Sequence, residues 1–249
     1  MSFDEGFARF ERSVWLRTTF GAVLDPDLPA EVEPFSFVPM DGLRELAVAL
    51  RLDRGDVLVD LACGRGGPGM WVARETGAVL VGVDGSAVGV AQAAARVGLF
   101  GLEETARFVV GDLAATGLPD ACADGVMSVD AIQFASDPVA CAREVLRVLR
   151  PGRWFALTNW EPDRPGDPDV PDRFRNLQLA DVLTTAGFYA VEVHERPAWD
   201  VRTEAVFEAA LAAGDPGGDE GLAMLQEEAR ARETWVQRRR RVIAVACRP

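Results

Sequence analysis

The stretch VLVDLACGRGGPG, residues 57–69, decides the fold because an apolar run passes through an acid into a glycine-rich segment. The β-branched and aliphatic residues up to Asp60 are typical of a buried strand. Gly64, Gly66 and Gly69 have the G-x-G-x-x-G spacing, which lets a backbone turn tightly and approach a ligand closely. The stretch therefore predicts a strand, a ligand-binding turn and the start of a helix.

Strands and helices alternate from this stretch to about residue 160. We predict strands at residues 56–62, 78–84, 106–112, 124–130 and 152–160, with a loop before the fourth strand and helices between the others. Continuous apolar runs of this kind are typical of parallel strands buried on both faces. Two further strands are predicted at residues 189–199 and 241–249. We therefore predict an α/β fold with a doubly wound, Rossmann-like sheet of seven mostly parallel strands and helical caps at both ends of the chain.

The charge and the cysteine pattern exclude several classes of function. A formal net charge of −13 over 249 residues repels nucleic acid and anionic membranes. The basic run Arg238–Arg241 is interpreted as the end of a helix and the start of a strand. One histidine and four scattered cysteines predict neither a metal site nor a disulfide framework. Without a signal peptide or a long apolar run, we expect a cytoplasmic protein that does not bind membranes.

Acids at the ends of three strands indicate the ligand. The carboxyl ends of parallel strands form the ligand crevice, so the Asp60 carboxylate would repel a pyrophosphate and attract a cationic group. This favours S-adenosylmethionine over a nicotinamide dinucleotide. Asp84 suits ribose hydroxyls, with Ser86 as the cap of the next helix. Asp112 suits an adenine amino group with Leu113 against the ring. Taken singly, Asp84 and Asp112 could instead be ordinary turn residues.

In these motifs the sequence resembles class I S-adenosylmethionine-dependent methyltransferases. The motifs are VLVDLACGRGGPG, LVGVDGS, FVVGDLAATGLPDACADGVMSVDAIQFASD and VLRVLRPGRWFALTNW. The first is similar to that of sterol C-methyltransferases, and the later ones to the ubiquinone-biosynthesis-like branch. Ala62 stands where the family commonly has glycine. DAIQF, residues 130–134, lacks the Pro-Pro-aromatic motif of enzymes that methylate amino groups of DNA bases or of glutamine.

The resemblance implies a set of functional positions. Asp130 and Gln133 match positions that line the methyl-transfer chamber of the family. The residues implied to bind the cofactor S-adenosylmethionine are Asp60, Ala62, Cys63, Gly64, Gly66, Asp84, Gly85, Ser86, Asp112, Leu113, Asp130 and Gln133. Asp130 and His194 are the candidates for proton transfer, although His194 is also interpreted as a surface histidine. Glu161 and Asp200 are further possible bases.

The expected function is methyl transfer to a small, largely apolar acceptor on carbon, oxygen or nitrogen. Aromatic residues near the crevice mouth suit such a molecule: Trp15, Phe35, Phe37, Trp160 and Trp199. A protein that binds the cofactor but catalyses cyclisation or nothing is the alternative, followed by a nicotinamide-dependent oxidoreductase. We expect one domain, with an N-terminal helical cap at residues 1–55, a cofactor-binding core at 56–160 and a substrate-side cap with closing strands at 161–249. The sequence leaves the oligomeric state open.

Overall fold

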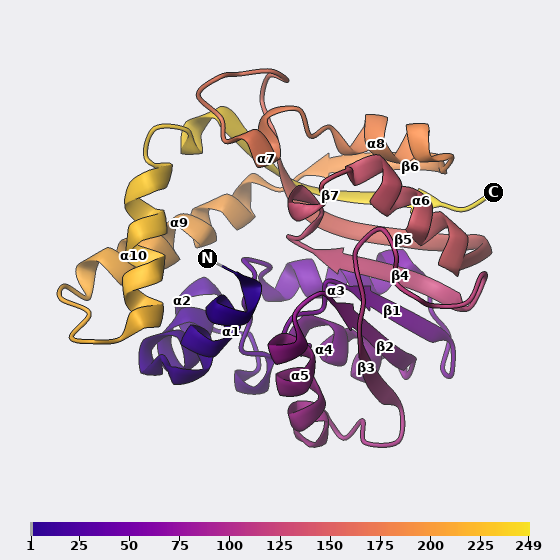
Figure 1. The fold of residues 1–249 in the computed structure, drawn as a ribbon, viewed down its shortest axis with the longest axis horizontal. Coiled ribbons are helices and arrows are strands. Elements are labelled where there is room, and N and C mark those ends of the chain that lie inside the picture. Colours follow the sequence, from indigo (N-terminus) through magenta and orange to yellow (C-terminus); the bar gives the residue numbers. More distant parts are fainter. Residues whose placement is uncertain (1) are drawn as a thin grey trace.

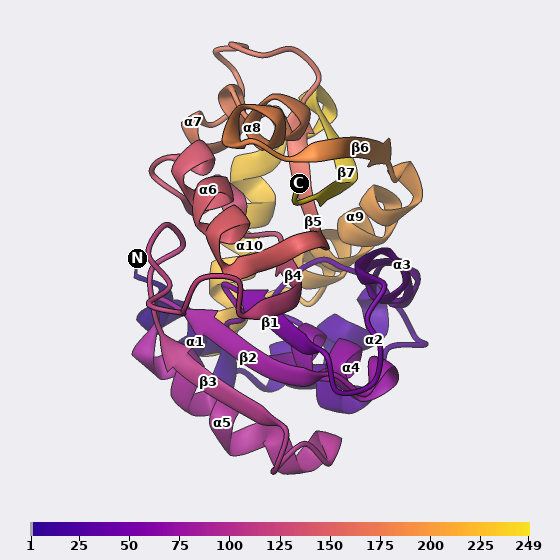
Figure 2. The ribbon, with the colours of Figure 1, turned by 90° about the vertical axis from the view of Figure 1, so that its right-hand side faces the viewer.

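The computed structural model of the protein describes residues 2–249. Seven strands form one sheet in the order β3-β2-β1-β4-β5-β7-β6. Figure 2 shows this succession from β3 at the bottom to β6 at the top. The strands are β1 (Val57–Leu61), β2 (Val79–Asp84), β3 (Ala106–Val110), β4 (Ala123–Val129), β5 (Leu149–Pro162), β6 (Tyr189–Glu195) and β7 (Arg239–Cys247).

The strand directions confirm the predicted fold. Strand β1 pairs in parallel with β2 and β4, and the parallel pairing continues to β3 on one side and β5 on the other. Only β7 is antiparallel, and it lies between β5 and β6. The carboxyl ends of β1 to β5 therefore lie at one edge of the sheet, where ligands bind in folds of this class.

Helices cover both faces of the sheet because each carries an apolar stripe. On one face lie α3 (Met40–Leu50), α4 (Gly67–Thr76) and α5 (Ala87–Phe100), and on the other α6 (Pro138–Val148) and α8 (Leu179–Ala186). In α3, Leu43, Leu46 and Leu50 recur at helical spacing and are fully buried. Burial of such stripes against the sheet is the main source of stability for the core.

The remaining helices form the caps. They are α1 (Phe3–Arg12), α2 (Gly21–Leu24), α7 (Asp172–Arg175), α9 (Pro197–Ala212) and α10 (Glu220–Arg232). Figure 1 shows α1, α2, α9 and α10 together at one end of the sheet. They share an apolar cluster that includes Phe10, Phe20, Phe207 and Leu225. The two ends of the chain thus build one joint cover.

Several element boundaries differ from the sequence-based expectations. In the N-terminal helical cap, α1 ends at Arg12, where the Ser13 side chain accepts the Leu16 N–H and a separate π-helical turn follows at Leu16–Phe20. The strand predicted at 189–199 ends at Glu195, since Pro197 opens α9. Short 3₁₀ turns occur at Ala30–Val32, Ile132–Phe134 and Val236–Arg238. The basic run does lie at a helix end and strand start, as predicted.

Membrane insertion has no structural support in the described part of the chain. No helix within residues 2–249 is both long and apolar enough to cross a bilayer. The four cysteines in the same range, at positions 63, 122, 141 and 247, are all unpaired.

Gly67 fixes the distance between the N-terminal cap and the core. A Cβ at this position would lie 1.9 Å from the carbonyl oxygen of Val32. We expect Gly67→Ala to lower the free energy of unfolding by about 1–3 kcal/mol, because the cap must move away. Urea unfolding measures this. Gly98→Ala is the matched control, since its nearest neighbour is the Glu103 side chain at 3.4 Å. Equal stability of Gly67→Ala and wild type would contradict the close packing.

Candidate active site

A cavity of about 360 Å³ lies beyond the carboxyl ends of β1 to β5, beneath the caps. Its lining divides into two halves of different chemistry. The carboxylate half contains Asp60, Asp84, Asp112 and the turn that follows β1. The aromatic half contains Phe37, Trp160, Phe174, Phe207 and Trp235. Such a cavity suits an elongated ligand, or two ligands, with one polar and one apolar end.

The turn after β1 needs a left-handed backbone at three positions. Ala62, Gly64 and Gly66 have φ angles of 60°, 51° and 77°. Glycine adopts this conformation without steric cost, whereas an alanine residue is strained by about 1–2 kcal/mol. The structure therefore explains why glycine is common in the family at the position of Ala62. The strain is maintained because the turn must bring its backbone to the cavity.

Asp60 is buried at the end of β1, against the first turn of α4. Its carboxylate accepts the Gly69 N–H, and a Cβ at residue 69 would lie 2.2 Å from Oδ2 of Asp60. Only glycine permits this approach. Burial, and secondarily the charge of Asp84, raise the pKa of Asp60 to about 8. The raised pKa means that the buried carboxylate is costly to ionise. A positive group beside Asp60 would stabilise the ionised form, so the site favours a cation.

Asp84 joins the turn to the end of β2. Its two oxygens accept the N–H groups of Gly64 and Ser86 at 2.7 and 2.8 Å. The residue is only 8% exposed, and burial raises the pKa of its carboxyl. Asp84 therefore shapes the turn from within and also faces the cavity.

Asp112 opens the loop between β3 and β4. Its Oδ1 accepts the Ala114 N–H at 2.8 Å, as in an ordinary Asx turn. The side chain is exposed on the cavity, and Leu113 lines the cavity beside it. The turn interpretation and the ligand interpretation of Asp112 are therefore compatible, because each uses a different oxygen.

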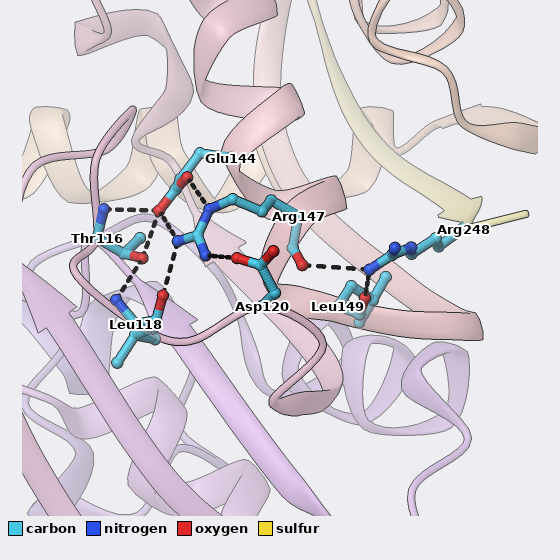
Figure 3. Close-up of polar contacts among 7 residues, drawn as sticks. All are labelled: Thr116, Leu118, Asp120, Glu144, Arg147, Leu149 and Arg248. Carbon is cyan, nitrogen blue, oxygen red and sulfur yellow. Dashed lines mark hydrogen bonds and ion pairs between the residues drawn. The ribbon is translucent and has the colours of Figure 1, made fainter.

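An ionic network around the buried Glu144 holds this loop in place (Figure 3). Glu144 of α6 accepts the Thr116 N–H and hydroxyl at 2.8 and 2.6 Å. Arg147 donates to Glu144 and to the Leu118 carbonyl, also at 2.8 Å. The hydrogen bond from Arg147 lowers the pKa of Glu144 to about 2. The network thus stays ionised at neutral pH and fixes the loop that carries Asp112.

Asp130 connects three separate segments at the middle of the cavity. Its carboxylate accepts the Thr158 hydroxyl at 2.7 Å and the Phe37 N–H at 3.0 Å, and it forms an ion pair with Arg241 of β7. With three donors engaged, this carboxylate is suited to positioning rather than to proton removal. Gln133 donates to the Asp130 carbonyl at 2.7 Å, and its buried Oε1 has no partner.

The aromatic half consists of rings from both caps and β5. Phe37 stacks on Phe207 at 5.0 Å and meets Trp160 edge-on at 5.9 Å. Of the aromatic residues expected here, Phe35, Phe37 and Trp160 line the cavity. Two others are structural instead. Trp199 is buried and donates to Asp41 at 3.2 Å, and Trp15 packs on the cap cluster.

The structure places nearly all of the predicted ligand-binding residues around this cavity. Those that line it are Asp60, Ala62, Cys63, Gly64, Gly66, Asp84, Gly85, Asp112, Leu113, Asp130 and Gln133. Ser86 does not, because its hydroxyl caps α5 and contacts Asp4 of α1. The placement of Ser86 among the ligand contacts is therefore corrected.

His194 lies outside the cavity lining. It is part of β6, its side chain is 48% exposed, and its ring pairs with Glu192 at 3.1 Å. This position agrees with the interpretation of His194 as a surface histidine. Glu161 and Asp200 are not lining residues either, because Glu161 accepts the Leu179 N–H and Asp200 accepts the Trp160 indole N–H.

The sequence analysis did not identify the basic residues of the cavity, which are Arg65, Arg173, Arg232 and Arg239. A signal for one of them was available, since alternate residues of a strand face the same side. Arg239 and Arg241 are buried toward the site, whereas Arg238 and Arg240 are partly exposed and pair with the exposed acids Asp169 and Glu195. It also missed Phe3 and Phe7 of α1 and Glu33, which line the cavity.

Comparison with known proteins shows what this site resembles. Residues 59–157, from β1 into β5, match the family model described as "Methyltransferase domain". This part of the chain is similar to methyltransferase domains. Cycloartenol-C-24-methyltransferase of Arabidopsis thaliana is 32% identical over 162 residues, which cover 59% of this chain and 48% of that protein. The chain thus spans about half the length of this curated relative. The predicted resemblance to small-molecule methyltransferases is confirmed.

Solved structures extend the likeness from this part of the chain to the caps. The [4+2]-cyclase SpnF superimposes with a TM-score of 0.69 and 27% identity, over 83% of this chain and 80% of that one. Geranyl diphosphate methyltransferase in complex with SAM has a TM-score of 0.65 at 18% identity, over 84% and 85% of the two chains. The second likeness concerns the fold alone.

Asp60 gives the protein a pH dependence with a definite sign. The pKa of Asp60 is near 8 in the folded protein and near 3.8 in the unfolded chain, so the folded state binds more protons between these values. Stability from this group therefore falls as the pH rises from about 4 to 8. We expect Asp60→Asn to be more stable than wild type at pH 8.5, and the advantage to shrink at pH 5.

Urea midpoints of both proteins at the two pH values measure the effect. The difference between the two proteins isolates Asp60, because all other titrating groups are common to both. Asp181→Asn on the exposed face of α8 serves as the control and should follow the wild type at both pH values. Parallel profiles of Asp60→Asn and wild type would contradict the burial of a charged group at the end of β1.

Proposed function

We propose that this protein transfers the methyl group of S-adenosylmethionine to a small, largely apolar acceptor. The observation that carries the proposal is the two-part cavity. Three strand-end carboxylates and a glycine turn line one half, and aromatic rings line the other. When bound, S-adenosylmethionine supplies a methyl group already activated by the sulfonium.

The carboxylate half offers a hydrogen-bond acceptor to the ammonium, the ribose hydroxyls and the adenine amino group of this cofactor. Asp60 faces the ammonium, and the left-handed backbone at Gly64 leaves room for the methionine portion. Asp84 accepts from the ribose hydroxyls, and Asp112 from the adenine amino group. Ala62, Cys63, Gly66, Gly85, Leu113, Asp130 and Gln133 complete the proposed contacts.

A nicotinamide dinucleotide fits less well. Its pyrophosphate would require free N–H groups at the start of α4. Asp60 already accepts the Gly69 N–H there, and its carboxylate would repel a second anion. The oxidoreductase alternative is therefore the weakest of the three.

In this proposal the chain contributes positioning more than proton transfer. Displacement at a sulfonium requires the acceptor atom in line with the methyl group, and correct orientation supplies much of the rate. Asp130 holds Phe37 through its N–H and Arg241 through an ion pair, so it fixes the boundary between the two halves. Exclusion of water by the caps strengthens the electrostatic interactions inside.

Cyclisation without methyl transfer is the second candidate. It is favoured by the likeness to the [4+2]-cyclase SpnF and by the aromatic half of the cavity, whose rings can hold an apolar chain in a folded conformation. The two functions differ in one observable, since only methyl transfer consumes S-adenosylmethionine.

The remaining expectations belong to the same proposal. Residues 1–55 and 161–249 act as caps on a cofactor-binding core at 56–160, and the whole chain is one functional unit. The net charge of −13 opposes nucleic acid and anionic membranes as partners. A cytoplasmic location agrees with four unpaired cysteines.

Asp84 gives a direct test of cofactor binding. We expect Asp84→Asn to weaken binding of S-adenosylmethionine by at least about tenfold, because a charge-assisted hydrogen bond to ribose is lost. Asparagine keeps an oxygen for one of the two N–H groups, so the fold should survive. Calorimetric titration measures the affinity, with NAD and NADP as alternative ligands and Asp181→Asn as the control. Unchanged affinity would assign Asp84 to the turn alone.

The acceptor class is tested with a cofactor that carries a labelled methyl group. We expect label in small apolar compounds extracted into organic solvent, and none in bulk RNA or DNA, because aromatic rings line half of the cavity and the surface is acidic. Scintillation counting of the separated fractions measures this. Nucleic acid labelled at enzymatic rates would overturn the proposal. Conversion of a polyene substrate without formation of S-adenosylhomocysteine would favour the cyclase.

A further inference from the structure

We propose that the acceptor carries an oxyanion, a carboxylate or a phosphate, which binds to Arg239 in the aromatic half of the cavity. This inference rests on the proposed function and specifies its substrate class. It arises from a buried cation that lines the cavity and is incompletely paired there.

Arg239, the first residue of β7, lines the cavity with a side chain that is only 3% exposed. Its guanidinium lies against two indole rings, 4.6 Å from the centroid of Trp160 and 5.4 Å from that of Trp235. Its Nε is buried without a hydrogen-bond partner. A buried donor left unpaired costs free energy comparable to a lost hydrogen bond, so this group is suited to receive one from a ligand.

The neighbouring acids do not fully compensate Arg239. The nearest carboxylates, Asp200 and Glu204, lie 3.5 and 3.6 Å from it, beyond good hydrogen-bond distance. Glu204 is already engaged by both terminal nitrogens of Arg232, at 2.7 and 2.6 Å. Burial, together with the nearby charges of Arg232 and Arg241, lowers the pKa of Arg239 to about 10 despite these acids. A ligand anion would offset that cost.

The local charge of the aromatic half supports an anion rather than a neutral polar group. Arg173, Arg232 and Arg239 line it together with Glu228, which lies 4.0 Å from Arg173. Arg232 is paired with Glu204, so Arg239 is the cation left with only the long contacts to Asp200 and Glu204. Arg241 behind them is compensated by Asp130. A neutral carbonyl or a water molecule would satisfy the Nε–H but would leave the charge unchanged. An oxyanion accepts the Nε–H and also neutralises the charge of Arg239. Charge-assisted hydrogen bonds of this kind are about twice as strong as neutral ones.

A second hollow adjoins the cavity and shares Arg173, Glu228 and Trp235 with it. It lies between α1, α10 and the start of α7. A ligand that entered here would meet Arg173 before it reached Arg239. The remainder of the chain is strongly acidic, so an anion is attracted only at this local cluster.

The test compares ligands that share an apolar chain and differ in the head group. Octanoate, octyl phosphate, octan-1-ol and octylamine are titrated into protein saturated with S-adenosylhomocysteine, with tryptophan fluorescence as the readout because Trp160 and Trp235 flank Arg239. We expect one of the two anions to bind at least about tenfold more tightly than octan-1-ol. The better of the two distinguishes a carboxylate from a phosphate. Equal binding of the alcohol and both anions would overturn the proposal.

Variants assign the preference to Arg239. Arg239→Met should reduce the ratio between anion and alcohol to less than about threefold, and Arg239→Lys should give an intermediate ratio because it keeps the charge without the Nε donor. Arg238→Met is the matched control, since its side chain pairs with Asp167 outside the cavity. If Arg239→Lys keeps the same ratio between anion and alcohol as the wild type, the role of the Nε donor is overturned. If Arg239→Met does not fold, the ratios measured for Arg239→Lys and for the wild type still decide the question. Binding of S-adenosylhomocysteine is measured first, and its absence would contradict the proposed function independently of the octanoate result.

Discussion

The Asp60 carboxylate, buried against the Gly69 N–H at the start of α4, sets the geometry on which the rest of the site depends. It requires a glycine at residue 69 and follows a tight turn in which the backbone is left-handed at Ala62, Gly64 and Gly66. The same backbone turn presents the Gly64 N–H to the Asp84 carboxylate. The ends of β1 and β2 are therefore joined through side-chain acceptors and backbone donors, and neither acid can be moved without the other.

The carboxylate half was predictable from sequence because its parts are local. Each acid ends its own apolar strand, and parallel strands bring their carboxyl ends to one edge. The glycine spacing and the Ser86 cap are also read within a few residues. Nothing beyond strand recognition was needed to gather Asp60, Asp84 and Asp112 around one cavity.

The aromatic half was less predictable because distant segments build it. Trp235 and Arg239 reach the cavity only because β7 inserts antiparallel between β5 and β6, and Phe7 only because α1 crosses to α5 and α10. Trp199 was expected near the crevice mouth but is buried in the core. Aromatic character alone does not distinguish a core residue from a cavity residue. His194, for which a surface position was also considered, lies on the edge strand with its side chain half exposed.

The position of β7 also has a consequence for biosynthesis. Strand β6 pairs with β7 alone, and β7 follows it in the chain after α9 and α10. During translation β6 therefore leaves the ribosome before its only partner strand exists, and the edge of β5 stays open for the same interval. At roughly 5–20 residues per second, that interval lasts several seconds. The exposed edges are a place where a chaperone or a second nascent chain could pair, so the order of synthesis makes this end of the sheet the most vulnerable to misassembly.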